Sequence, residues 1–172
     1  MGISRTVPGS VGTDGNLLIL ATPLSALPNY PEVTLPELES DAAKDVTYSL
    51  TTTGFNNGIT EESVTDERLT LAAVLAQPGR VTETVEMQYV YGTKDDVADK
   101  LLQRGEDYVI SVRRAIAHNE ALAAAQLFDH LVVKAGIKRP DPETANGKFT
   151  KTQGFYPQDE SQRDVPLAAT AG

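Results

Sequence analysis

Apolar and polar side chains alternate along much of the chain. The longest such stretch is residues 81–91, VTETVEMQYVY, in which Val81, Val85, Met87, Tyr89 and Tyr91 share one face and threonine, glutamate and glutamine the other. A period of two predicts a β-strand with one buried face. The same alternation predicts further strands over 45–51 and 108–116.

Shorter runs predict strands at 17–22, 130–137 and 148–155. Asn57-Gly58 and Asn146-Gly147 are typical of two-residue hairpin turns. Two segments leave alternatives open. Residues 69–81 have a helix-like composition, but Pro78-Gly79 and the flanking strand residues favour a long loop or hairpin arm between strands. Residues 119–128 fit either a helix or a turn followed by a strand edge.

One helix is well signalled, over residues 94–104. Thr93 occupies an N-cap position with Asp96 three residues later, and Gly105 follows the last turn. Val97 and Leu101 lie at i and i+4, so they are predicted to form the face that packs on the core. A shorter helical turn is predicted around residues 35–40.

The order of strands, one helix and more strands predicts a mainly β fold, a β-sandwich or barrel whose open end or face is covered by the helix. Residues 1–16 are predicted to be an N-terminal arm and residues 17–139 the β-sandwich core. Within that core, residues 54–80 are predicted to form a long loop. Residues 140–172, rich in proline and charge, are predicted to be a C-terminal arm.

The net charge of −9 is concentrated in the first part of the chain. Residues 1–99 hold 15 acids and 5 bases, whereas residues 100–172 hold 9 acids and 10 bases. A protein that grips DNA needs a basic patch, and none is evident. No run approaches the roughly 18 apolar residues of a membrane span, and the absence of cysteine excludes disulfides.

Motifs for catalysis or cofactor binding are absent from the sequence. It contains no P-loop, GxGxxG, GxSxG or HExxH pattern, and His118 and His130 have no third ligand at metal spacing. We therefore predict no enzyme activity, no cofactor and no metal site. Arg113 and Arg114 lie side by side in a predicted strand, so their side chains face opposite ways, and at least one is expected to pair with an acid.

An acidic cluster follows the first Asn-Gly pair. The simplest interpretation of Glu61, Glu62, Asp66 and Glu67 is a solvated strand edge or loop. The alternatives are a divalent-cation site or a wall that repels phosphate. TEESVTDER lacks the alternating acids and turn glycine of a calcium loop.

In order and length, these features resemble the major tail protein, or tail tube protein, of long-tailed non-contractile bacteriophages. The resemblance covers residues 17–168 and depends on LLILATP, KDVTYSLTTTGF, TDERLTLAAVLAQPGRVTETVEMQYVYG, DDVADKLLQRG and DYVISVRRAI. It implies a structural virion protein, assembled in the bacterial host cytoplasm, with six copies per ring and rings stacked into a hollow tube. Genomic DNA would pass through that tube during ejection without specific binding, and the tape measure, tail tip and terminator proteins would be partners.

The resemblance also implies roles for particular residues. Acids that face the lumen would repel the DNA backbone; the candidates are Glu61, Glu62, Asp66, Glu67, Glu83 and Glu86. The loop 54–80 and the terminal arms would grip the next ring, and the candidates for ring stacking are Leu69, Leu71, Val74, Leu75, Pro78 and Arg80. An apolar loop exposed on a monomer would be an aggregation hazard, but burial of the loop between rings would remove that hazard.

Two other functions remain open at this point. A tail terminator or connector would cap a tube and lack one stacking surface, which the long arms at both termini argue against. A soluble β-sandwich module that binds a small ligand or glycan would display exposed aromatic residues, whereas most tyrosines here follow strand periods.

Overall fold

The computed structural model describes residues 7–68 and 73–170 and is mainly β, which confirms the predicted fold class. Its short helices are α1 (Leu35–Leu38) and α2 (Val97–Leu101), and two 3-10 turns cover Leu24–Ala26 and Thr47–Ser49. The strands are β1 (Leu17–Pro23), β2 (Lys44–Asp45), β3 (Leu50–Asp66), β4 (Leu75–Val90), β5 (Asp107–Arg114), β6 (Leu127–Pro140), β7 (Thr150–Pro157) and β8 (Gln162–Pro166).

The chain forms two compact units. Unit 1 comprises residues 1–47, 109–131 and 161–172, and unit 2 comprises residues 48–108 and 132–160. Strands β5 and β6 each contribute residues to both units.

In unit 1 the strand order is β2-β1-β5-β6-β8, and the β1–β2 and β6–β8 pairs are antiparallel. Continuous apolar runs produce strands that are buried on both faces, so Ile19, Ile110, Phe128 and Leu131 are each at most 1% exposed. Helix α1 begins where the Glu37 carboxylate accepts hydrogen bonds of 2.8 Å from both the backbone N–H and the hydroxyl of Thr34. This confirms the predicted helical turn at 35–40.

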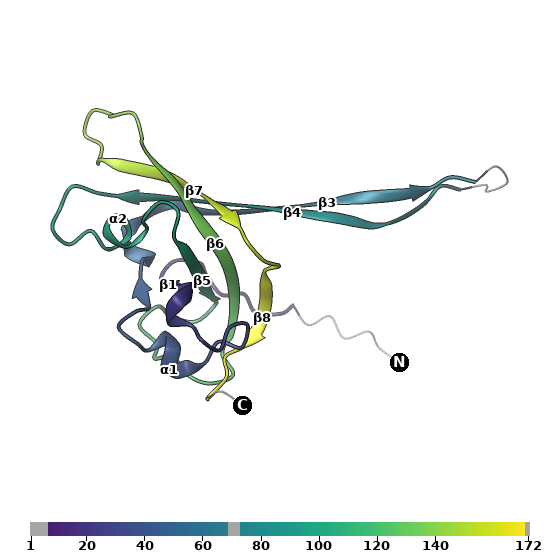
Figure 1. Cartoon of the computed structure of the whole chain (residues 1–172), viewed down its shortest axis with the longest axis horizontal. Helices are drawn as coiled ribbons and strands as arrows, with labels where there is room; N and C mark the ends of the chain where they lie inside the picture. The colour runs from purple at the N-terminus through teal and green to yellow at the C-terminus, as the bar shows by residue number, and fades with distance from the viewer. Residues whose placement is uncertain (1–6, 69–72, 171–172) are drawn as a thin grey trace. The chain divides into compact units, whose positions relative to one another are not determined.

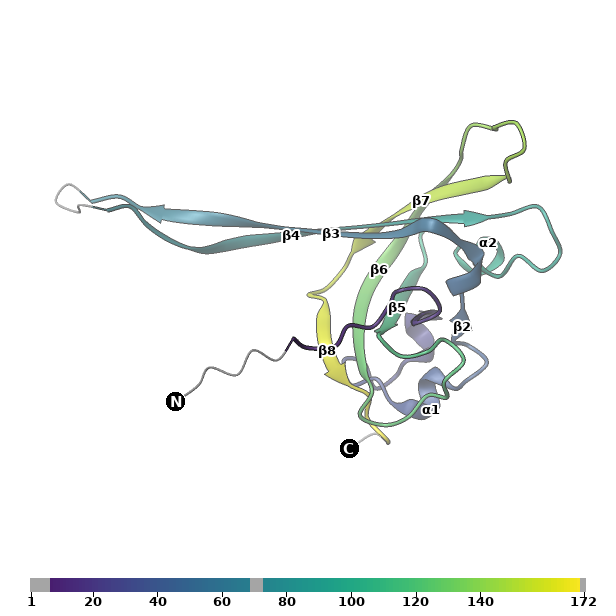
Figure 2. The same ribbon diagram turned by 180° about the vertical axis from the view of Figure 1, so that it is seen from behind.

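In unit 2 the order is β6-β7-β4-β3, with all neighbours antiparallel. Val85, Met87 and Tyr89 are buried, as their alternation predicts. Strand β4 pairs with β7 only from Val85 to Val90, whereas β3 and β4 stay paired as far as Asp66 and Leu75. Figure 1 shows the two strands running on together past β7, and Figure 2 shows the same hairpin from behind.

The helix prediction was right in place but wrong in extent and in its buried face. Helix α2 has five residues, because the Asp96 carboxylate accepts the backbone N–H groups of Gly92 and Thr93 and so holds residues 92–96 as a turn. Val97 is 37% exposed and Leu101 is half-buried, while Ala98 and Leu102 are fully buried. The apolar face is therefore one position further along than predicted.

The predicted arm 140–172 is not an arm in the described residues. Strand β7 lies between β4 and β6, β8 pairs with β6, and Leu167 is buried. The proline-rich composition that suggested an arm marks the turns between these strands. Residues 7–14, from the predicted N-terminal arm, have no regular hydrogen-bonded structure and are exposed.

Two local signals in the sequence also failed, one for a turn and one for a strand. Asn57-Gly58 does not turn the chain; it lies inside β3, opposite Val85 and Thr84. Over 45–51 the predicted strand is interrupted: β2 ends at Asp45, a 3-10 turn covers Thr47–Ser49, and β3 begins only at Leu50, so Tyr48 is exposed. Conversely, Asn146 does adopt a left-handed turn conformation, with φ 61°, and residues 119–126 form turns before β6 rather than a helix.

Candidate functional site

Residues 59–66 and 74–83 make up an extension of unit 2 that is two-stranded where β3 and β4 pair, here called the hairpin arm. The predicted loop 54–80 is thus largely strand, because β3 and β4 pair from Asn56↔Glu86 outward to Asp66↔Leu75. In the described part of the chain no third strand pairs with the arm. Isolated two-stranded ribbons are marginally stable in water. Packing or strand pairing against a further partner would therefore stabilise the arm.

The register of the arm fixes which side chains share a face. Ile59 lies opposite Glu83, and Glu61 lies opposite Val81. Residues directly opposite one another on antiparallel strands point to the same side. Because side chains alternate along β4, Val81 and Glu83 point to the same side as the buried Val85. Acidic and apolar side chains are therefore mixed on this face of the arm.

The candidate lumen acids are therefore not brought onto one wall. Glu61 and Glu83 lie on the face just described, whereas Glu62, Asp66 and Glu86 occupy the alternate positions of their strands. A shift in register between the Glu61 and Ser63 pairs marks a bulge near Gly79. Asp66 pairs with Arg68 at 2.9 Å, and Glu67 follows the end of β3.

Part of the candidate stacking set lies on the arm. Leu69 and Leu71 fall outside the described residues, Pro78 lies opposite Ser63, and Arg80 is exposed. Sequence reasoning missed Ile59 and Val64, although their spacing among polar residues in ITEESVTD was the available signal. The large apolar side chains exposed on the arm, each between 49% and 62%, are Ile59, Val64, Val74, Leu75 and Val81.

A different surface of unit 2, which we call the polar face, lies on the side of the sheet opposite the buried residues. It consists of Thr84, Glu86, Gln88, Arg139, Asp141 and Thr152. Its charged groups contact other members of the set. Arg139 Nη2 lies 3.2 Å from Glu86 Oε2, Gln88 donates to Asp141 at 3.0 Å, and the Thr152 hydroxyl donates to Asp141 at 2.7 Å.

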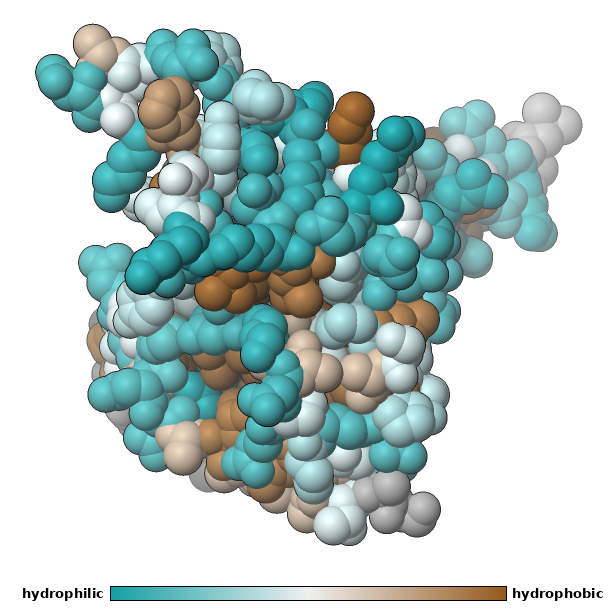
Figure 3. Space-filling view, turned by 60° about the vertical axis from the view of Figure 1, so that its left-hand side comes forward, coloured by the Kyte–Doolittle hydropathy of each residue, from teal (hydrophilic) through white to brown (hydrophobic). Residues whose placement is uncertain are grey.

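A hollow of about 440 Å³ lies beside this polar face. Its lining residues include Ile137, Arg139, Tyr156 and Gly154, and the space where a Cβ of Gly154 would stand is open. In Figure 3, hydrophobic side chains reach the surface in several places on the face shown.

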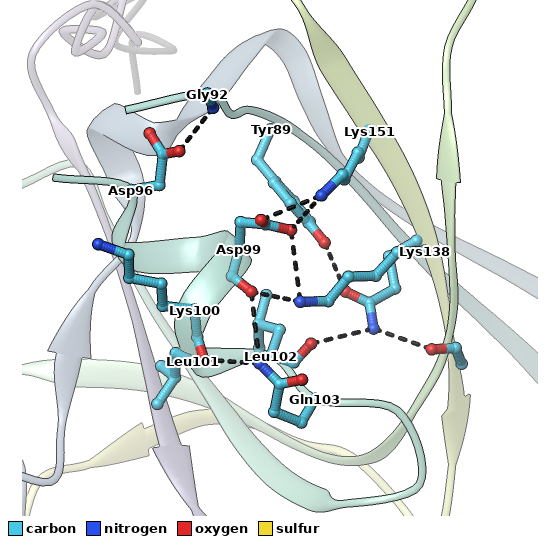
Figure 4. Close-up of polar contacts among 12 residues, drawn as sticks. Tyr89, Gly92, Asp96, Asp99, Lys100, Leu101, Leu102, Gln103, Lys138 and Lys151 are labelled. Atoms are coloured by element: carbon cyan, nitrogen blue, oxygen red, sulfur yellow. Dashed lines mark hydrogen bonds and ion pairs between the residues drawn. The ribbon is translucent and has the colours of Figure 1, made fainter. Parts of the chain in front are cut away.

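On the opposite side of the same sheet, α2 is held by a polar cluster (Figure 4). Asp99 accepts from Lys151 at 2.9 Å and lies 3.3 Å from Lys138, while Tyr89 donates to buried Gln153 at 2.9 Å. Burial by itself would raise the pKa of Asp99, but the hydrogen bond from Lys151 and the charge of Lys138 hold that pKa below its usual value. Burial raises the pKa of Tyr89, and the nearby charge of Asp99 adds to the effect.

The described ranges 7–68 and 73–170 contain no group of three or more His, Asp or Glu residues that could hold a metal ion. Ser111 and His130 form a hydrogen bond of 2.8 Å, but both side chains are fully buried and so have no route to a substrate. Within the same ranges, no helix has the length and hydrophobicity to cross a membrane.

Comparison with known proteins gives a family and a fold. Residues 5–170 match the family described as phage tail tube protein. No curated protein matches the chain. Among solved structures, one chain of the anti-feeding prophage (AFP) baseplate, determined by cryo-EM and symmetrised six-fold, is similar in fold, with a TM-score of 0.56 and 10% identity over 96% of this chain and 99% of that one. Since the family match spans nearly the whole sequence, the chain belongs to the phage tail tube protein family.

Proposed function

We propose that this phage tail structural protein assembles as rings of six copies, and that the rings stack head to tail into a hollow tube. Genomic DNA passes through the tube during ejection without specific binding. Its partners in this proposal are further copies of itself, the tape measure protein, and the tail tip and terminator proteins.

The observation that carries this proposal is the hairpin arm. Its two strands leave the rest of the sheet, expose five large apolar side chains and have no third strand paired with them in the described residues. Burial of apolar area contributes roughly 25 cal/mol per Å², so covering these side chains against another subunit would stabilise both partners. An arm of one subunit that packs on a different surface of the next makes a heterologous contact, which propagates into a filament.

The number of copies is supported less directly. The cryo-EM structure of the baseplate that contains the similar fold was symmetrised six-fold. Six copies would also unite six sheets around one axis, which supplies neighbours for the edge of β3 that no other strand of residues 7–68 and 73–170 pairs with. The net charge of −9 per copy suits a conduit that does not retain a polyanion.

A second candidate is a terminator or connector ring, which closes a tube and does not elongate. Such a ring would use the arm for stacking on only one of its two sides. The same microscopy separates the two functions, because a terminator would give discrete rings at every concentration whereas a tube subunit would give rods.

The test is negative-stain electron microscopy of the purified chain over a range of concentrations. We expect hollow rods, or rings that stack as concentration rises. The double variant Ile59→Ser, Val81→Ser removes the apolar side chains from one face of the arm without touching the buried core. We expect it to fold, as judged by circular dichroism, and to form no rods.

The matched control is Leu127→Ser, which changes an exposed apolar residue of unit 1 outside the arm. It should leave rod formation in place. Rods of normal length from the arm variant would show that the arm does not join the rings. A monomer at all concentrations would exclude self-assembly of the isolated chain.

A further inference from the structure

Two exposed apolar surfaces of unit 2 lie outside the hairpin arm. One consists of Ile137 and Tyr156 beside the hollow, and the other is centred on Phe149; all three side chains are more than half exposed. Strand β4 pairs with β7 from Val85 to Val90. The hollow lies at the Val85 end of this pairing, where the arm leaves the sheet, whereas Phe149 lies just beyond the Val90 end.

Phe149 forms a pair with a second aromatic residue. Its ring centroid lies 6.1 Å from that of Tyr91, and the Phe149 carbonyl accepts the Tyr91 backbone N–H at 3.1 Å. The Lys151 ammonium lies 4.1 Å from the centre of the Tyr91 ring and donates to Asp99 (Figure 4). A tilted ring pair and a cation over a ring are both attractive arrangements, so these contacts hold the two rings in place. We call Tyr91 and Phe149 the aromatic end.

The charge around Phe149 is opposite to that of the arm. Residues 145–153 contain two bases, Lys148 and Lys151, and no acid, whereas the two strands of the arm contain four acids and one base. Residues 92–96 add one base and two acids, and one of these acids, Asp96, is bonded within its own turn. Opposite charges on two surfaces favour their encounter and fix its orientation.

The arm and the aromatic end lie on the same face of β4 but far apart along it. Side chains alternate from Val81 through Val85 to Tyr91, so these three point to one side, and Ile59 belongs to the same face of the arm. Ten residues of extended chain separate Val81 from Tyr91, which is about 33 Å at 3.3 Å per residue. One copy therefore cannot cover its own aromatic end with its own arm.

Opposite ends of one subunit suit a contact that propagates. A copy whose arm occupies the aromatic end of a second copy still offers its own aromatic end to a third, so the contact is heterologous and does not close. The hollow does not meet this condition, because it lies at the root of the arm itself. Aliphatic side chains that pack on aromatic rings also remove apolar area of both partners from water.

We propose that the aromatic end is the docking site for the hairpin arm of a second copy of this chain. Ile59 and Val81 of one copy pack on the rings of Tyr91 and Phe149 of the other, and the acids of the arm lie beside Lys148. This inference rests on the proposed function, which needs a contact made by the arm but leaves open what the arm contacts.

The chain contains no cysteine, so a pair of introduced cysteines can be cross-linked without interference. Ser63 shares a face of the arm with Ile59, Lys148 precedes Phe149, and both are exposed. Rods of the double variant Ser63→Cys, Lys148→Cys are treated with a short bismaleimide and separated by denaturing electrophoresis. We expect a ladder of covalent dimers, trimers and longer chains, because the two positions of one copy lie more than about 30 Å apart and each link must join two copies.

The matched control combines Ser63→Cys with Leu127→Cys, an exposed position of unit 1, and should give no ladder. A product that stops at the dimer, or equal ladders from the two double variants, would overturn the docking site. So would rods of the Lys148 variant that give no cross-linked product. In each of these cases the rods themselves leave the proposed function standing.

Removal of the ring provides an independent measure. Phe149→Ser should raise the protein concentration needed for rods by about tenfold, because the arm then has less apolar area to cover. Tyr156→Ser removes an equally exposed ring at the other end of β7 and should change that concentration by less than about twofold. Circular dichroism checks that both variants fold.

Equal effects of the two substitutions, or no effect of Phe149→Ser, would overturn the inference while rods still form. Absence of rods from the wild-type chain would instead contradict the proposed function, and this inference with it.

Discussion

Arg113 and Arg114 are neighbours in sequence with opposite environments. Arg113 is fully buried, and its guanidinium donates to the carbonyls of Ala117 and Glu120 at 2.9 and 3.0 Å and to the Gln126 side chain at 2.9 Å. Arg114 points the other way, as the strand period predicts, and it pairs with Asp129, as expected for at least one of the two. Arg113 thus fixes the turns between β5 and β6 through their backbone carbonyls.

Replacing the buried arginine should cost far more than replacing its neighbour. We expect Arg113→Met to lower the free energy of unfolding by about 2 to 4 kcal/mol, because several carbonyls of the turns lose a charged donor whose own side chain is fully buried. Arg114→Met should cost about 1 kcal/mol or less, since the Arg114 side chain is half exposed. Urea unfolding at neutral pH measures both, and equal losses would contradict this role of Arg113.

His130 is the second residue whose burial has a measurable consequence. It stacks on Phe128 with ring centroids 5.8 Å apart and shares a hydrogen bond with Ser111. Burial lowers the pKa of His130 to about 4, against a weaker opposing effect of the Asp129 charge. In the unfolded chain the same imidazole titrates near pH 6.5.

The unfolded state therefore binds more protons than the folded state between about pH 6.5 and 4, and stability must fall as pH falls through that window. We expect a loss of roughly 3 kcal/mol across it, with no contribution from this group above it. His130→Gln should flatten the dependence, whatever its cost at neutral pH. Urea midpoints measured in steps from pH 7.5 to 4 provide the check; an unchanged slope in the variant would refute the assignment.

At the scale of elements, α2 is held in place by charge as much as by apolar packing. Five residues make too short a helix to be stable alone. Ala98 and Leu102 anchor one side, and Asp99 binds Lys138 and Lys151 from β6 and β7. The ion pairs join the helix to two strands that follow it by some 40 to 50 residues.

Asp99→Asn should leave two partly buried lysines, 20% and 18% exposed, without their carboxylate. We expect the free energy of unfolding to fall by about 2 kcal/mol. Hydrogen exchange at the Leu102 amide, which bonds to Ala98, should accelerate. Asp95→Asn, an exposed change in the preceding turn, is the matched control and should stay within about 0.5 kcal/mol. Similar effects of the two variants would contradict an anchoring role for Asp99.

The hairpin arm is the element that assembly depends on. The chain does not turn at Asn57-Gly58, because Asn57 and Gly58 pair within a ladder that continues for a further eight residues. Local turn chemistry was overridden there by pairing with β4. If changing only Ile59 and Val81 abolishes rod formation, the contact between subunits lies on this paired segment of β3 and β4.

At the scale of the whole molecule, the two units share strands rather than consecutive segments. Unit 1 uses the beginning, the middle and the end of the chain, and unit 2 uses the parts between. The C-terminal residues 140–170 are needed by both units, through β7 and β8. This is why the composition of that segment was a poor guide to its place in the fold.

The sequence by itself determined the mainly β class, the positions of β1, β4 and β5, the opposite faces of Arg113 and Arg114, and the family resemblance. These follow from side-chain periodicity and from the order of segments, which are local properties of the chain. Only the tertiary structure decided the length of the arm, the burial of Ala98 and Leu102 in place of Val97, the separation of the candidate acids onto two faces, and the pairing of Glu86 with Arg139. Each of these depends on which strand lies beside which, and in what register, over separations of up to 53 residues, where no local pattern carries the information.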